Sequence, residues 1–208
     1  MALSCILIFI QMAWVEASAQ GVRDLEPFTG VGVSISADVW YTPGNTHEIR
    51  IEGDEDDVRE LITEVRDGFL KIKYDDWRTR RSKLDIYITS RELEEVKISG
   101  SADFFVEESL NAGEVDLAVS GNGGIYFSKL EAEEVEVKLS GSGGVEIESG
   151  SAEELDAKIS GSGKLMAESF EVEEFSAAIS GSGGVEITAT GELDAKISGS
   201  GKVYYHGN

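Results

Sequence analysis

The second half of the chain repeats a Ser-Gly-Ser-Gly segment at a nearly constant interval, and this repeat limits the possible folds more than any other feature. Successive copies are separated by 21, 20, 20, 20 and 18 residues, and their first serines are Ser99, Ser120, Ser140, Ser160, Ser180 and Ser198. A fixed period of this length is typical of a solenoid, in which every copy forms one coil that packs on its neighbours.

The residues around each copy alternate between apolar and polar with a period of two. In the fourth copy, residues 155–159 read Leu-Asp-Ala-Lys-Ile, and the third copy alternates in the same way. This is the period of a β-strand, whereas a helical repeat would show a period of 3.6. Since most intervals are even, inward residues should stack in columns from coil to coil. Two predicted columns are Val135, Leu155 and Phe175, and Leu139, Ile159 and Ile179.

We predict that the first glycine of each copy forms a corner between two strands, because glycine adopts positive φ without a Cβ clash. The predicted corner residues are Gly100, Gly121, Gly141, Gly161, Gly181 and Gly199. A phosphate-binding interpretation of residues 161–164 fails, since Lys158 and Leu165 stand where that motif needs Gly and Ser or Thr. The calcium-binding nonapeptide pattern fails as well, because no Asp follows the Gly-Gly pairs.

Outward charges also recur in register. Acids lie four residues before the first serine in most copies (Glu95, Asp116, Glu136, Asp156, Asp194), and lysines lie two before it (Lys97, Lys138, Lys158, Lys196). We expect these columns to neutralise each other as a solvated face. The loops between coils carry acids without lysines: Glu131, Glu133, Glu134, Glu153, Glu154, Glu171, Glu173 and Glu174. We predict no cofactor; weak calcium binding by these loops is the alternative.

The chain divides into three predicted parts. Residues 1–19 read as a signal peptide, because the apolar run 3–15 is shorter than the roughly 20 residues of a membrane span and the small-x-small triplet 17–19 follows it. No Lys or Arg precedes the run, so an uncleaved anchor is the alternative. We expect export to the periplasm, cell surface or exterior. The only cysteine, Cys5, lies in this segment, which excludes disulfides from the mature chain.

Residues 20–91 form a predicted β-rich N-terminal part, and residues 92–208 form the solenoid of six repeats. Strands are expected at 31–35, 39–42, 47–52, 69–74 and 84–89, and a short helix at 54–62 begins with an acidic turn. A basic cluster in this part (Arg78, Arg80, Arg81, Lys83) is interpreted as an exposed hairpin tip. A docking site for the acidic solenoid or for a polyanionic glycan is the alternative.

Composition argues against several function classes. With 40 acidic and 18 basic residues, the formal charge of -22 would repel nucleic acid and anionic membranes. The mature chain has no cysteine nucleophile, and its two histidines, His47 and His206, are too few for a transition-metal site. We therefore predict a protein that is not an enzyme. A polysaccharide-degrading β-helix enzyme is the catalytic alternative, since two carboxylates would suffice for hydrolysis.

Outward aromatic residues would favour a glycan-binding module, because sugars stack on rings. Parity places Phe104, Phe127 and Tyr205 in the core, and Phe105, Tyr126 and Tyr204 outside. Phe105 and Tyr126 should be neighbours in adjacent coils. The column then reaches Glu146, so no long aromatic platform is predicted.

The order of segments resembles a known family. Residues 28–31 (Phe-Thr-Gly-Val), 37–39 (Ala-Asp-Val), 51–55 (Ile-Glu-Gly-Asp-Glu) and 68–72 (Gly-Phe-Leu-Lys-Ile) precede the Ser-Gly coils. This layout is similar to the secreted bacterial proteins of the putative auto-transporter adhesin, head GIN domain family, over nearly all of the mature chain. The resemblance implies a right-handed parallel β-helix and an adhesin-like role, and it supplies no catalytic residues.

We therefore expect an all-β chain, a right-handed parallel β-helix with coils of about 20 residues, preceded by a β-rich segment with one short helix. The expected function is that of a non-enzymatic extracytoplasmic interaction protein that presents a rigid acidic surface. Its partner would be a protein or glycan at the cell surface, neither nucleic acid nor membrane, and the sequence does not indicate an oligomeric state.

Overall fold

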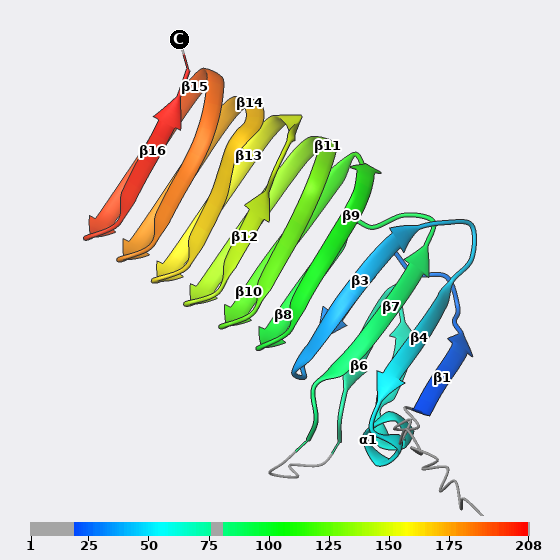
Figure 1. The fold of residues 1–208 in the computed structure, drawn as a ribbon. Helices are drawn as coiled ribbons and strands as arrows, with labels where there is room; N and C mark the ends of the chain where they lie inside the picture. The colour runs from blue at the N-terminus through cyan, green and yellow to red at the C-terminus, as the bar shows by residue number, and fades with distance from the viewer. Residues whose placement is uncertain (1–18, 76–80, 208) are drawn as a thin grey trace, which may run out of the picture.

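The computed structural model describes residues 19–75 and 81–207, which form one continuous 16-stranded β-sheet wound into a solenoid (Figure 1). The predicted signal peptide therefore lies outside the described residues except for Ala19. Arg78 and Arg80 of the basic cluster lie outside them too. The prediction of an all-β parallel β-helix with one short helix is confirmed.

In the repeat region, each coil stacks on the next through parallel strands in the expected register. Every first serine pairs with the first serine of the following copy, as Ser140 does with Ser160. The strands are β8 (Glu95–Gly100), β9 (Asp103–Asn111), β10 (Glu114–Gly121), β11 (Gly124–Gly141), β12 (Gly144–Ile147), β13 (Gly150–Gly161), β14 (Lys164–Gly181), β15 (Gly184–Gly199) and β16 (Lys202–His206).

The core consists of the inward columns. Val135, Leu155 and Phe175 are register partners and are at most 2% exposed, which confirms one predicted column; Leu139, Ile159 and Ile179 confirm the other. One inward prediction is wrong, because Tyr205 is 62% exposed. Tyr205 does pair with inward Ile187, but β16 pairs only with β15, so no further coil of the described chain covers it.

The N-terminal part contains the five expected strands and two more. Its elements are β1 (Ala19–Asp24), β2 (Gly30–Val33), β3 (Ala37–Pro43), β4 (Glu48–Gly53), α1 (Glu55–Glu60), β5 (Ile62–Arg66), β6 (Phe69–Lys73) and β7 (Leu84–Ser90). Asp54 caps the helix: its side chain accepts hydrogen bonds from the backbone N–H groups of Asp56 and Asp57. β1 and β5 were not predicted.

These elements do not stack in chain order. The coil formed by β2 and β3 lies between the coil of β6 and β7 and the coil of β8 and β9, and all these pairings are parallel. β4 pairs antiparallel with β7, β1 with β4, and β5 with β6. The same sheet therefore runs from the N-terminal part into the repeats without a break in pairing.

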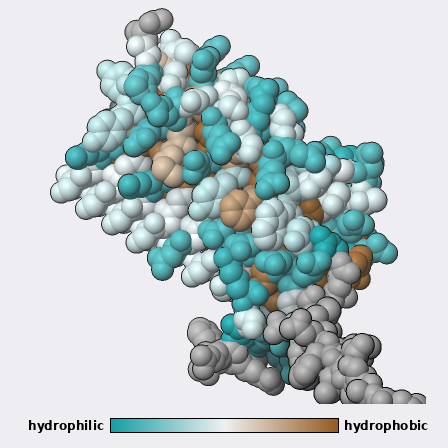
Figure 2. Space-filling model, in the orientation of Figure 1, coloured by the Kyte–Doolittle hydropathy of each residue, from teal (hydrophilic) through white to brown (hydrophobic). Residues whose placement is uncertain are grey.

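Each coil has two long outer faces, one on either side of the Ser-Gly corner. We call the face formed by β7, β3, β9, the first half of β11, and β12 the ladder face. We call the face formed by β2, β8, β10 and the second halves of β11 and β13 the lysine face. Figure 2 shows a largely hydrophilic to intermediate surface with small scattered apolar groups.

Candidate functional site

Four aromatic rings on the ladder face stack in one line across four adjacent strands. Tyr87 of β7, Trp40 of β3, Phe105 of β9 and Tyr126 of β11 are successive register partners, and we call them the aromatic ladder. Their ring centroids are 5.0, 5.8 and 4.9 Å apart in that order, and the interplanar angles lie between 14° and 23°. The four side chains are half-buried.

The β-sheet itself sets this spacing. Residues on either side of each ring, such as Val39 and Tyr41 around Trp40, are buried, so alternation turns the rings outward. Strands in a sheet lie about 4.8 Å apart, close to the distance at which aromatic rings stack favourably. Register pairing of four outward rings therefore produces a rigid stack.

The sequence predicted only part of this ladder. Phe105 and Tyr126 are neighbours as expected, and the next register partner of Tyr126 is Glu146. The column is longer than predicted, because it continues on the other side through Trp40 and Tyr87. The alternation within residues 37–43 and 84–90 marks both rings as outward, but the order in which these strands stack departs from the order of the chain.

Stacking leaves few ring faces free. Each inner ring is covered on both sides, and the outer face of Tyr87 is covered by the guanidinium of Arg50, whose Cζ lies 3.8 Å from the ring centroid. The face of Tyr126 turned away from Phe105 points toward β12 and Glu146. Partial burial raises the pKa of the Tyr126 hydroxyl, and the carboxylates of Asp103, Glu146 and Asp38 add to this effect.

A depression of about 210 Å³ lies beside this end of the ladder. It is lined by Phe105, Val106, Glu107, Tyr126, Phe127, Ser128, Glu146 and Glu148. The rings of Phe105 and Tyr126 supply apolar surface, and the carboxylates of Glu107, Glu146 and Glu148 surround it. The arrangement suits a planar ligand group that can stack on a ring and that is either cationic or rich in hydrogen-bond donors.

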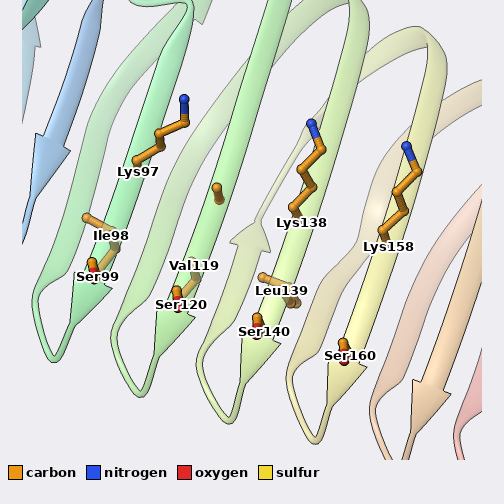
Figure 3. Close-up of a pocket in the computed structure, with 11 residues that line it drawn as sticks. Lys97, Ile98, Ser99, Val119, Ser120, Lys138, Leu139, Ser140, Lys158 and Ser160 are labelled. Carbon is orange, nitrogen blue, oxygen red and sulfur yellow. The ribbon is translucent and has the colours of Figure 1, made fainter.

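The lysine face carries the predicted charge columns, and Figure 3 shows Lys97, Lys138 and Lys158 of the lysine column. A shallow depression of about 440 Å³ lies where Ala118 interrupts the lysine column, between Lys97 and Lys138. Glu136 pairs with Lys138 at 2.5 Å and with Lys158 at 2.8 Å, and these hydrogen bonds lower the pKa of Glu136 to about 2. The charges thus neutralise each other locally, as expected of a solvated face.

The acids that the sequence placed in loops between coils form a third surface. The loop prediction is wrong, because these residues lie within strands β11, β13 and β14. Six glutamates (Glu133, Glu134, Glu153, Glu154, Glu173, Glu174) line a depression of about 300 Å³, which we call the acidic edge. Glu154 is exposed, but neighbouring atoms remove part of its hydration and raise its pKa, and repulsion from Asp156, Glu134 and Glu174 raises it further. Within residues 19–75 and 81–207, no three His, Cys, Asp or Glu side chains are grouped to hold a metal ion. Weak calcium binding here stays a prediction.

The six glycines named from the repeat lie at the strand ends before each corner. Their φ angles run from +118° to +132°, a region that L residues rarely adopt. Each of the last five stacks on the equivalent glycine of the preceding coil, and a Cβ there would lie 2.4–2.6 Å from a backbone oxygen. These geometric facts concern the backbone of the repeat and identify no ligand.

The described members of the basic cluster act within the fold. Arg81 bonds to Glu60 at 3.1 Å and lies 3.5 Å over the ring of Tyr74, and Lys83 pairs with Asp38 at 2.7 Å. Arg81 therefore fixes the segment after β6 to helix α1, and Lys83 ties β7 to β3.

The histidines do not meet. His47, just before β4, contacts the ring of Phe28. His206, on the last strand β16, lies 3.3 Å from Glu168 of β14. These positions are at opposite ends of the sheet, so the described residues contain no histidine pair. No helix among them is long and apolar enough to cross a membrane.

Solved structures share this fold. A structure described as a putative adhesin from Bacteroides fragilis has a TM-score of 0.82 and 20% identity, covering 92% of this chain and 95% of that one. A putative adhesin from Parabacteroides distasonis has a TM-score of 0.67 and 19% identity, covering 91% and 97%. A putative lipid binding protein from the same species has a TM-score of 0.64 and 19% identity, covering 90% and 96%.

At such identities the likeness shows the fold alone. No curated protein matches the chain. The family suggested by the sequence is nevertheless confirmed, because its model matches residues 27–208, which is most of the chain. The chain therefore belongs to the family described as putative auto-transporter adhesin, head GIN domain.

Proposed function

We propose that this chain is a non-enzymatic, adhesin-like interaction protein of the extracytoplasmic space, and that it meets its partner through the ladder face. The observation that carries this proposal is the aromatic ladder. Its rings are held by stacking and by register pairing, so they lose little side-chain freedom on binding. Aromatic residues are also the side chains most enriched at binding hot spots. Membership of the adhesin family supports the same role.

The catalytic alternative has weaker support. Hydrolysis of a glycosidic bond needs one carboxylic acid and one carboxylate placed across the bond. The acids here recur in regular columns, as Glu134, Glu154 and Glu174 do on the acidic edge. Such regular placement is typical of a solvated surface. It does not set one carboxyl group apart as the catalytic acid and another as the base.

A glycan partner is the second candidate, and the free face of Tyr126 favours it. Sugars stack on exposed ring faces, but stacking within the ladder covers the faces of Trp40 and Phe105. A glycan could therefore stack at one end only. This geometry favours a partner that contacts the edges of the rings as well, which is the way protein interfaces use aromatic side chains.

The proposal is tested with the labelled protein on a glycan array, on isolated cell envelopes and in a reducing-end assay with polysaccharides. We expect saturable binding to an envelope or surface component and no release of reducing ends. Phe105→Thr keeps strand propensity but interrupts the ladder, and it should abolish binding.

The matched control is Tyr204→Thr, which removes an outward aromatic residue that is 54% exposed and lies outside the ladder. It should bind like the unaltered protein. Release of reducing ends, or binding that Phe105→Thr leaves unchanged at an unchanged melting temperature, would contradict the proposal.

A further inference from the structure

The two ends of the aromatic ladder differ in what covers them. At the Tyr87 end, Arg50 of β4 lies in register with the ring and places its guanidinium 3.8 Å from the centroid. The same guanidinium donates a hydrogen bond to Glu52, two residues along the strand. One end of the ladder is thus closed by a cation that stacks on a ring and pairs with a carboxylate.

At the Tyr126 end, the ring and the carboxylates are present without a cation. Glu146 occupies the register position that corresponds to Arg50, and Glu148, just past the end of β12, lines the same depression. Among residues 19–75 and 81–207, no Lys or Arg lies over the Tyr126 ring, and Glu107, Glu146 and Glu148 form no salt bridge. The depression of about 210 Å³ opens here.

The chain uses this combination of groups a second time. Arg81 lies 3.5 Å over the ring of Tyr74, and its guanidinium bonds to Glu60 at 3.1 Å and Asp57 at 3.4 Å. A tyrosine face next to glutamate therefore binds a guanidinium at two places within the described fold. Tyr126 with Glu146 offers the same groups to the outside.

We propose that the Tyr126 end of the ladder binds the arginine side chain of a basic protein partner. The guanidinium would stack on the free face of Tyr126, as Arg50 does on Tyr87, and would pair with Glu146. This inference rests on the proposed function and names the chemistry of the partner at the same surface.

Arginine fits better than lysine, because a planar guanidinium stacks on a ring while donating in its own plane to a carboxylate. The size of the depression agrees with a single side chain, since it is smaller than the roughly 300–1,000 Å³ of small-molecule pockets. The net charge of -22 draws a basic partner toward this surface.

The probe is a fluorescent peptide, acetyl-(Arg-Gly)3-amide, compared with its Lys-Gly equivalent by fluorescence anisotropy with the purified protein. We expect the arginine peptide to bind more tightly. Tyr126→Leu and Glu146→Gln should each weaken its binding at least about fivefold, given typical cation–π and charged hydrogen-bond strengths. Tyr126→Phe keeps the ring face and should retain the affinity.

Glu154→Gln is the matched control, because it removes one carboxylate from the acidic edge, away from any ladder ring. It should leave the affinity within about twofold, as surface charges at a distance do at moderate salt. Equal losses from Glu154→Gln and Glu146→Gln would indicate general charge attraction and overturn the inference. So would equal binding of both peptides, or no binding.

The two failures can be told apart. If Phe105→Thr abolishes envelope binding while Tyr126→Leu leaves the affinity for the arginine peptide unchanged, the proposed function stands and this inference is wrong. If the arginine peptide depends on Tyr126 and Glu146 but envelope binding ignores Phe105, the site stands and the proposed function is wrong.

Discussion

Gly161 shows how the backbone of the repeat selects its residues. Its φ is +118°, and a Cβ atom built on it would lie 2.6 Å from the carbonyl oxygen of Gly141 in the preceding coil. That oxygen belongs to a strand paired on both sides, so it cannot move away alone. The angle and the contact each disfavour any side chain here.

We predict that Gly161→Val destabilises the protein by more than about 2 kcal/mol, the sum of an unfavourable backbone angle and an overpacked contact. Thermal and urea unfolding measure this loss. Ser162→Ala is the control, since Ser162 is the next residue and is exposed. This variant should melt at the same temperature as the unaltered protein. A Gly161→Val protein of unchanged stability would favour flexible ligand-binding loops instead.

In neighbouring strands, residues of the same kind lie in register, so the charge of one affects the pKa of the next. Glu134, Glu154 and Glu174 are register partners, and their mutual repulsion contributes to the raised pKa of Glu154. Glu136 and its two lysines show the opposite case, because their ion pairs lower the pKa of Glu136 to about 2. Two neighbouring strands therefore differ: β13 contains a carboxylate whose ionisation opposes folding, and β11 contains one whose ionisation favours it.

This difference predicts opposite pH profiles for two variants. The folded pKa of Glu154 lies above the ordinary 4.5, so its ionisation destabilises the fold at pH 7, and that penalty disappears as the pH falls through the folded pKa. Glu154→Gln should thus melt higher than the unaltered protein at pH 7 and equally at pH 4.

Glu136 behaves in the reverse sense, since its folded pKa of about 2 lies below 4.5. Its ion pairs stabilise the fold above pH 4.5 and are lost as the pH falls from there toward 2. Glu136→Gln should therefore melt lower at pH 7, and the difference should shrink between pH 4.5 and 2. Melting curves at constant ionic strength test both; profiles of the same sign would contradict the assignment.

The sequence predicts regular elements better than it predicts their order in space. Period and parity identified the columns through Leu155 and Ile159, because within the repeats the chain neighbour is also the spatial neighbour. That rule fails at residues 30–90, where the coil of β2 and β3 is placed between two later coils. Half of the aromatic ladder, Trp40 and Tyr87, was missed for this reason.

For the molecule as a whole, export is a proposal that a mass measurement tests. We predict cleavage after Ala19, which would leave Gln20 of β1, the register partner of Glu52, as the mature N-terminus. The intact mass of the protein recovered outside the cytoplasm should correspond to residues 20–208. A mass that includes residues 3–15 would indicate an uncleaved anchor.

The stacking order of the first coils also decides how the molecule responds to force. The repeats stack in the order of the chain, and the last strand, β16, pairs only with β15. A load on the C-terminus would peel the repeats one at a time, each releasing roughly 65 Å of extended chain. Peeling is resisted at β7, the strand that precedes β8 in the chain, because β7 pairs with β3 on one side and with β4 on the other. The protein would therefore lengthen under tension while its N-terminal end, with Trp40 and Tyr87 of the aromatic ladder, stays folded.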